Sequence, residues 1–194
     1  MASKRSGSTR TIRPTSGTKD YNRSVFLNEV SKPDIIRSGS YFSDKTGAYS
    51  LFMEGHNYVK EEVEAARILA DEGYITILTP EGIELYGKPS KKKKNRLSYI
   101  DGVIAGFSYE QATPNPDNNT TEGRKRSVNN ALSHARDKGA RVALIYDKNE
   151  VFHREDMQAG IELFERHNKY RFQAIITINN VHPKNRVNEW EHTK

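Results

Sequence analysis

The sequence contains no cysteine. Disulfide bonds, thiolate nucleophiles and cysteine-based zinc sites are therefore excluded. No apolar run approaches the ~18 residues that a membrane-spanning helix needs. The first residues carry no apolar stretch of the kind that forms a signal peptide. We therefore expect neither a membrane segment nor a secretory leader.

Several short motifs that mark enzyme classes are also missing. No GxGxxG or GxxxxGKS/T loop occurs, which argues against a dinucleotide-binding or nucleotide-hydrolysing protein. The GxSxG elbow of serine hydrolases is absent as well. The six histidines do not show the spacing of zinc ligands. Any chemistry must come from other side chains.

Positive charge is unevenly distributed along the chain. The net charge is +6, and residues 1–40 hold eight Lys and Arg against three Asp and Glu, a net of +5. This segment is rich in Ser and Thr and poor in large apolar side chains, so we expect a flexible basic arm or linker. The excess charge indicates a polyanionic partner, with nucleic acid the first candidate and a membrane surface the second.

Hydrophobic spacing predicts one folded domain over residues 41–181 and a polar tail over 182–194. Apolar side chains at helical spacing predict helices over 58–71, 122–138 and 156–167. β-branched and aromatic runs predict strands over 49–53, 74–78, 99–104, 107–111, 142–146 and 174–178.

The order of these elements predicts an α/β (mixed α+β) fold. The last strand–helix–strand segments favour parallel pairing with right-handed crossovers. The two strands around Ala105-Gly106 form an antiparallel hairpin with a tight turn. We therefore expect a mixed sheet with a central antiparallel hairpin, flanked by helices.

The hairpin, IDGVIAGFSYEQA, carries two carboxylates. Asp101 and Glu110 stand on its two strands, and a hairpin can bring such side chains together on one face. Their repulsion requires a cation, and Mg²⁺ is often held by one or two carboxylates together with phosphate and water. It then polarises a phosphoryl oxygen and activates a bound water. The pair therefore indicates magnesium-dependent chemistry at phosphate.

With Asp101 before the turn and Glu110-Gln111 after it, the sequence resembles the PD-(D/E)xK nuclease superfamily, whose core has the order αβββαβ. The runs ILTPEG and IDGVIAGFSYEQ, with the helix after them, resemble the C-terminal tRNA-nuclease domains of bacterial contact-dependent inhibition toxins. This resemblance covers roughly residues 41–181. It implies that Asp101 and Glu110 are catalytic, metal-binding acids and that Gln111 occupies the variable position.

Position 112 departs from the family pattern. The resemblance implies a catalytic lysine there, but the sequence has Ala112. Three explanations are open: a deliberate replacement that silences a toxic protein, a naturally inactive relative that only binds, or a lysine supplied by another element. Lys125 is a candidate donor in the third case.

An acid on the first helix commonly joins the site in this family, and Glu61, Glu62 and Glu64 are available. Glu62 lies beside the apolar stripe of Val59 and Val63, so we expect it to be the third catalytic and metal-binding carboxylate. Alternatively, all three glutamates merely stabilise the positive end of the helix dipole.

Two basic clusters are candidates for nucleic-acid binding. One lies on the loop before the hairpin, and the other opens the second long helix, where free N–H groups attract phosphate. Their members are Lys91, Lys92, Lys93, Lys94 and Arg96, and then Arg124 and Lys125. The alternative for each cluster is an ordinary solvated surface with no ligand. His56 is a candidate general base or phosphate contact, and the alternative is a structural role. His134 can face the site from the second long helix, and the alternative is an ordinary surface helix.

We therefore predict a metal-dependent endonuclease, with tRNA favoured over DNA as substrate. The resemblance implies a bacterial toxin domain that acts in the cytoplasm and is blocked by a cognate immunity protein. A catalytically silent nucleic-acid-binding module and a DNA endonuclease are the alternatives. The sequence does not separate RNA from DNA, because recognition of the 2′-hydroxyl depends on pocket detail.

Overall fold

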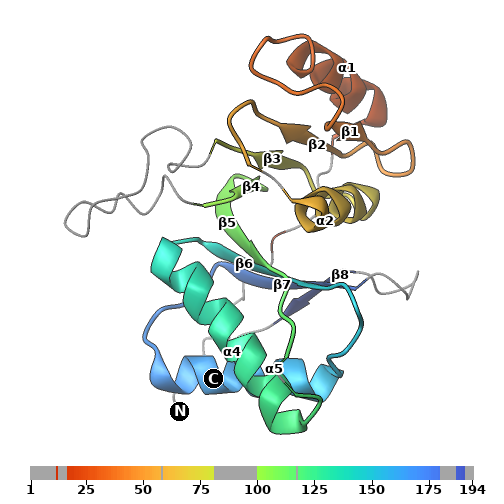
Figure 1. The fold of residues 1–194 in the computed structure, drawn as a ribbon. Coiled ribbons are helices and arrows are strands. Elements are labelled where there is room, and N and C mark those ends of the chain that lie inside the picture. Colours follow the sequence, from red (N-terminus) through yellow and green to blue (C-terminus); the bar gives the residue numbers. More distant parts are fainter. Residues whose placement is uncertain are drawn as a thin grey trace, which may run out of the picture.

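The computed structural model describes residues 12, 17–57, 59–80, 100–116, 118–179 and 187–190. These ranges form one eight-stranded sheet and four helices (Figure 1). The strands are β1 (Tyr41–Phe42), β2 (Tyr49–Phe52), β3 (Thr76–Leu78), β4 (Gly102–Ile104), β5 (Phe107–Ala112), β6 (Val142–Asp147), β7 (Ala174–Asn179) and β8 (Val187–Trp190). The helices are α1 (Lys19–Glu29), α2 (Lys60–Asp71), α4 (Thr121–Lys138) and α5 (Arg154–His167).

The strands lie in the sheet in the order in which they occur in the chain. Each strand–helix–strand unit is parallel: β2 with β3, β5 with β6, and β6 with β7. The remaining neighbours are antiparallel, including the β4–β5 hairpin. The predicted α/β class, the mixed sheet and its central hairpin are therefore confirmed.

Helices cover both faces of the sheet. One face of β2, β3 and β5 packs on α2, through buried side chains such as Phe52, Leu78 and Tyr109. The opposite face of β2 packs on α1, through Tyr49 and Leu51. Further along that second face, α4 and α5 lie together against β5, β6 and β7 (Figure 1). The core is thus two apolar layers separated by the sheet.

The hairpin turn places β4 and β5 in a fixed register. Ala105 and Gly106 both have positive φ (49° and 83°), the combination that a two-residue turn needs to match the twist of its strands. Gly102 then lies opposite Tyr109, and a Cβ on Gly102 would lie 2.2 Å from the carbonyl oxygen of Ile77. This close approach of β3 to β4 requires glycine at that position.

Two parts of the chain differ from the sequence expectations. Within the segment expected to be a flexible arm, residues 19–29 form helix α1, because Phe26 and Val30 bury apolar surface against Tyr49. Within the expected polar tail, residues 187–190 form β8, which pairs antiparallel with β7. The basic residues Lys91, Lys92, Lys93, Lys94 and Arg96 lie outside the described residues.

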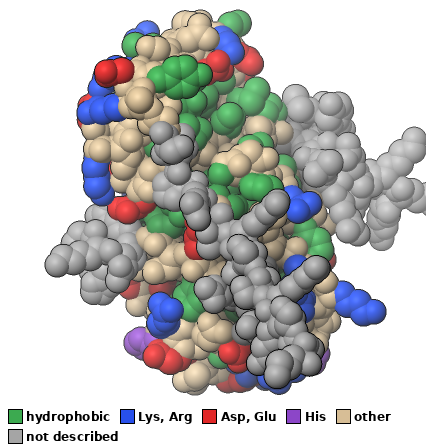
Figure 2. Space-filling model, turned by 180° about the vertical axis from the view of Figure 1, so that it is seen from behind, with side chains coloured by type: hydrophobic (Ala, Val, Ile, Leu, Met, Phe, Trp, Pro, Cys, Tyr) green, Lys and Arg blue, Asp and Glu red, His purple; other side chains and the backbone are tan. Residues whose placement is uncertain are grey.

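The surface is mixed in character. Figure 2 shows apolar side chains gathered on the upper part of the reverse face, at the end of the molecule formed by α1, β1 and β2. Acidic and basic side chains are interspersed around them. Among the described residues, no helix combines the length and apolar character needed to cross a membrane.

Candidate active site

The hairpin brings the two predicted carboxylates together. Gly102 pairs with Tyr109, and Asp101 directly precedes that pair on one strand while Glu110 directly follows it on the other. Both side chains are buried, with 4% and 2% of their surface exposed. Asp101 Oδ2 accepts a hydrogen bond from the backbone N–H of Gln111 at 2.6 Å. Asp101 therefore also ties the two strands together beside Glu110.

Glu110 is held by two side chains from α4. Its Oε1 atom lies 2.9 Å from His134 Nε2 and 2.8 Å from Lys138 Nζ. His134 and Lys138 are four residues apart, so they lie on the same face of the helix. The imidazole of His134 remains 56% exposed, whereas the carboxylate beneath it is buried. The result is an accessible base fixed by a buried acid, with a cation beside both.

Electrostatics favour the neutral form of His134. Partial burial, followed by the charge of Lys138, lowers its pKa below the usual 6.5, although Asp137 acts in the opposite direction. Lys138 Nζ also lies 2.8 Å from the Glu110 oxygen that contacts His134. The Nε2 atom faces Glu110 and so carries the hydrogen, which leaves the lone pair on Nδ1. His134 is thus able to accept a proton.

Ala112 occupies the expected lysine position without any polar group. It lies two residues after Glu110, on the same face of β5, opposite Ile145 of β6. Its methyl group packs against the apolar cluster of α4 and α5. The lysine beside Glu110 is Lys138, whereas Lys125, the donor considered from sequence, bonds Glu122 at 2.8 Å.

Glu62 is anchored away from Glu110, on the helix that covers the other face of the sheet. Its Oε2 accepts the backbone N–H of Val59 at 2.9 Å and lies 3.2 Å from His56 Nε2. His56 Nδ1 lies 2.7 Å from the carbonyl oxygen of Thr79, so this ring nitrogen carries a hydrogen. These contacts fix the start of α2 to the end of β3.

Tyr109 is buried on the α2 side of the sheet, and its hydroxyl is affected by the charges of the three predicted acids. Its hydroxyl is fully buried, and burial raises its pKa well above the usual value. The negative charges of Asp101, Glu62 and Glu110 raise it further, in that order. The acids therefore influence the same hydroxyl. Glu62 and Gln111, on the α2 side, share a shallow cavity there with Thr113.

The acids do not form a ready metal centre. In the ranges that the structure describes, no three His, Asp or Glu side chains are gathered as metal ligands. Glu110 already accepts two cationic or imidazole donors, and Asp101 accepts a backbone N–H. The donor arrangement does not fit Mg²⁺ as it stands, and we derive no step through a metal ion.

The second basic cluster is held by acidic partners. Arg124 Nε lies 2.6 Å from Asp156 Oδ2, and the two side chains are 12% and 3% exposed. This ion pair joins α4 to α5. Lys125 is more exposed but is paired with Glu122 on its own helix. Arg124 therefore has a structural partner that the sequence analysis did not foresee.

Comparison of the chain with protein-family models found no matching family, and searches of curated proteins and of solved structures found no match either. The function must therefore be inferred from the geometry of Glu110, His134 and Lys138. Glu110 and His134 were already candidates from the sequence. Lys138 was missed, although its spacing of four from His134 is a signal that the two share a helix face.

Proposed function

We propose that this protein is a nuclease that cleaves RNA, with His134 as general base, Glu110 as the acid that orients it and Lys138 as the stabilising cation. The observation that carries the proposal is the contact of one buried carboxylate oxygen with both the exposed imidazole and the lysine. A nucleophile needs a base held in one tautomer by a third group, and these residues supply both parts.

The reaction uses the 2′-hydroxyl of RNA as its nucleophile. Neutral His134 accepts the 2′-hydroxyl proton at Nδ1, and the 2′ oxygen bonds to the neighbouring phosphorus. Glu110 stabilises the imidazolium that forms, and Lys138 stabilises negative charge on the phosphorane. The bond to the 5′ oxygen then breaks, and the imidazolium returns its proton to that oxygen. The products are a 2′,3′-cyclic phosphate and a 5′-hydroxyl end.

Two further features support the nuclease assignment. The order α2, β3, β4, β5, α4, β6 is the order of the nuclease superfamily that the sequence resembles. Lys138 supplies, from another element, the lysine that Ala112 lacks. The same resemblance favours tRNA as substrate, a toxin role in the bacterial cytoplasm and a cognate immunity protein as partner.

A second candidate is the metal-dependent nuclease. Asp101 and Glu110 favour it as two buried carboxylates of one hairpin, because Mg²⁺ is often held by one or two carboxylates. The ion would have to displace His134 and Lys138 from Glu110. That enzyme would activate water rather than the 2′-hydroxyl and would also cleave DNA.

The test is incubation of the protein with total tRNA, with a short RNA and with DNA of the same sequence, each in Mg²⁺ or in EDTA. We expect discrete RNA fragments with cyclic phosphate ends in both buffers and intact DNA. Loss of cleavage in EDTA, or cleavage of DNA, would replace this mechanism with the metal-dependent one. Binding without cleavage of any substrate would identify the silent binding module.

The rate of RNA cleavage should depend on pH through His134. Because its pKa is lowered, the imidazole stays neutral to a pH below the usual 6.5 and loses its capacity as base only at lower pH. We expect the acidic limb of kcat/KM to have its midpoint below pH 6.5. A midpoint above that value would show that another group is the base.

A further inference from the structure

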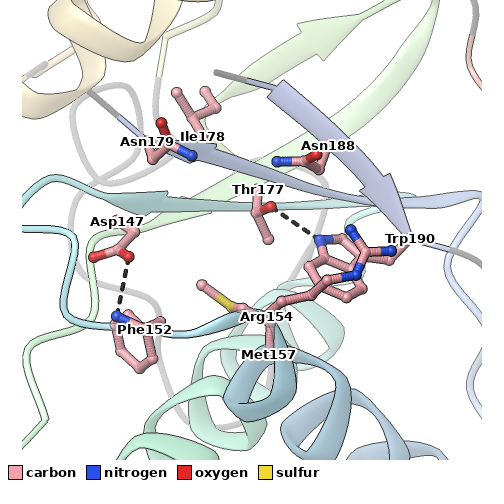
Figure 3. Close-up of a pocket in the computed structure, with 9 residues that line it drawn as sticks. All are labelled: Asp147, Phe152, Arg154, Met157, Thr177, Ile178, Asn179, Asn188 and Trp190. Carbon is pink, nitrogen blue, oxygen red and sulfur yellow. Dashed lines mark hydrogen bonds between the residues drawn. The ribbon is translucent and has the colours of Figure 1, made fainter. Parts of the chain in front are cut away.

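A second concave site lies at the carboxyl ends of two parallel strands. Asp147 is the last residue of β6 and Asn179 the last of β7, and between them opens a cavity of about 210 Å³ (Figure 3). The start of α5 and strand β8 close its other sides. Ligands of parallel α/β sheets commonly bind at this edge. The cavity is separate from Glu110 and His134 and takes no part in the chemistry proposed above.

One wall of the cavity is a fixed aromatic surface. Trp190 donates a hydrogen bond from Nε1 to Thr177 Oγ1 at 2.9 Å, which sets the orientation of the indole. The guanidinium of Arg154 lies 5.1 Å from the centre of the Trp190 ring. Phe152 and buried Met157 line the cavity as well. A flat ligand would therefore stack on this wall by taking the place of the Arg154 guanidinium over the indole.

The remaining lining is polar and offers both donors and acceptors. Asp147 accepts the backbone N–H groups of Val151 and Phe152 at 3.0 and 3.1 Å, so its buried carboxylate is held in one orientation. The amides of Asn179 and Asn188 each contain a carbonyl oxygen and an NH₂ group. The edge of a nucleobase carries the same two kinds of group, and such edges are read by hydrogen bonds.

A cation stands at the mouth of the cavity. Arg154 is exposed and is the first residue of α5, where the helix dipole also favours an anion, although Glu155 and Asp156 of the same turn act in the opposite direction. A stacking wall, a mixed polar edge and a cation together match the three parts of a nucleotide: the base, its hydrogen-bonding edge and the phosphate.

We propose that this cavity binds one unpaired nucleobase of the RNA, stacked beside Trp190 and Phe152, with the adjoining phosphate at Arg154. The inference rests on the proposed function, because it takes RNA as the ligand. It adds a site that selects an unstacked nucleotide at a distance from the scissile bond. Single-stranded loops, whose bases can be splayed out, then become the preferred substrates.

The test uses the only tryptophan of the chain as a probe. Trp190 lines the cavity, so its fluorescence reports on this site alone. The protein is titrated with AMP, GMP, CMP and UMP, and with ribose 5-phosphate as a ligand without a base. We expect saturable quenching by at least one nucleotide and none by ribose 5-phosphate. No saturable change with any nucleotide, or an equal change with ribose 5-phosphate, would overturn the proposal.

Two variants locate the binding. Arg154→Gln removes the exposed cation, and Asn179→Ala removes an amide from the polar edge; each is expected to weaken nucleotide binding by about tenfold. Arg166→Gln is the matched control, because Arg166 is exposed near the opposite end of α5. Equal weakening by the control, or unchanged binding in both test variants, would contradict the site. Thermal unfolding of each variant shows whether a loss of binding is a loss of fold.

Failure of this proposal can be told apart from failure of the proposed function. Nucleotide quenching in a protein that cleaves no RNA would support the cavity and remove the enzyme. RNA cleavage without quenching, and unaffected by Arg154→Gln or Asn179→Ala, would support the enzyme and overturn the base site.

Discussion

Replacement of His134 by glutamine is expected to lower kcat for RNA cleavage by about 10²–10⁴-fold, the range that general-base catalysis contributes. Glutamine keeps an N–H donor that can reach Glu110 but has no nitrogen able to accept a proton at neutral pH. Because the imidazole is 56% exposed, its loss should leave the fold intact. The measurement is single-turnover cleavage of a labelled RNA, with urea unfolding of the same preparation.

His167→Gln is the control for this variant. His167 is exposed and lies in the last turn of α5. The His167→Gln variant should therefore cleave RNA at the rate of the unchanged protein. Equal rates for His134→Gln and the unchanged protein would remove His134 from the reaction. A variant that loses both activity and stability would assign the histidine to structure instead.

Replacement of Arg124 by alanine is expected to lower the free energy of unfolding by about 3–5 kcal/mol, the cost of leaving a buried charge without its partner. Asp156 is only 3% exposed and receives the Arg124 Nε–H at 2.6 Å. The same Asp156 oxygen accepts the backbone N–H of His153 at 3.0 Å, where α5 begins. Loss of the arginine therefore weakens both the α4–α5 contact and the start of α5. Urea denaturation measures the effect.

Lys125→Ala is the matched change next to Arg124. Its ion pair with Glu122 is a surface pair within one helix, and such pairs contribute about 0.2–1 kcal/mol. If Arg124→Ala were as stable as Lys125→Ala and only bound RNA more weakly, the arginine would be a phosphate contact, as the sequence analysis expected.

Local patterns were sufficient to predict most of the fold. The periods of apolar residues located α2, α4, α5 and the strands from β2 to β7 to within a few residues. The turn residues Ala105 and Gly106 located the hairpin. Helix α1 was missed because its charged and polar face dominates its composition, and its stability comes from Phe26 and Val30 packing on β2. Strand β8 was missed because its residues, VNEW, show no strand pattern without β7 beside them.

The site was harder to predict than the fold. Asp101 and Glu110 follow from the hairpin register, which is a local property. The contact of Glu110 with His134 and Lys138 joins residues 24 and 28 positions apart, and it depends on which face of α4 packs against β5. The resemblance to the nuclease superfamily, with the position of the apolar stripe, placed Glu62 in the same site. In the structure α2 covers the other face of the sheet and Glu62 contacts His56.

Because every strand pairs only with strands that precede or follow it directly in the chain, the sheet can assemble progressively, without closing a loop around strands already formed. Pairings between chain neighbours keep the average sequence separation of contacts low, and such topologies fold faster than sheets with interleaved strands. The same order means that force applied to either end of the sheet would peel off β1 or β8 first. Under force the strands would therefore detach one after another, and the sheet would not rupture in a single step.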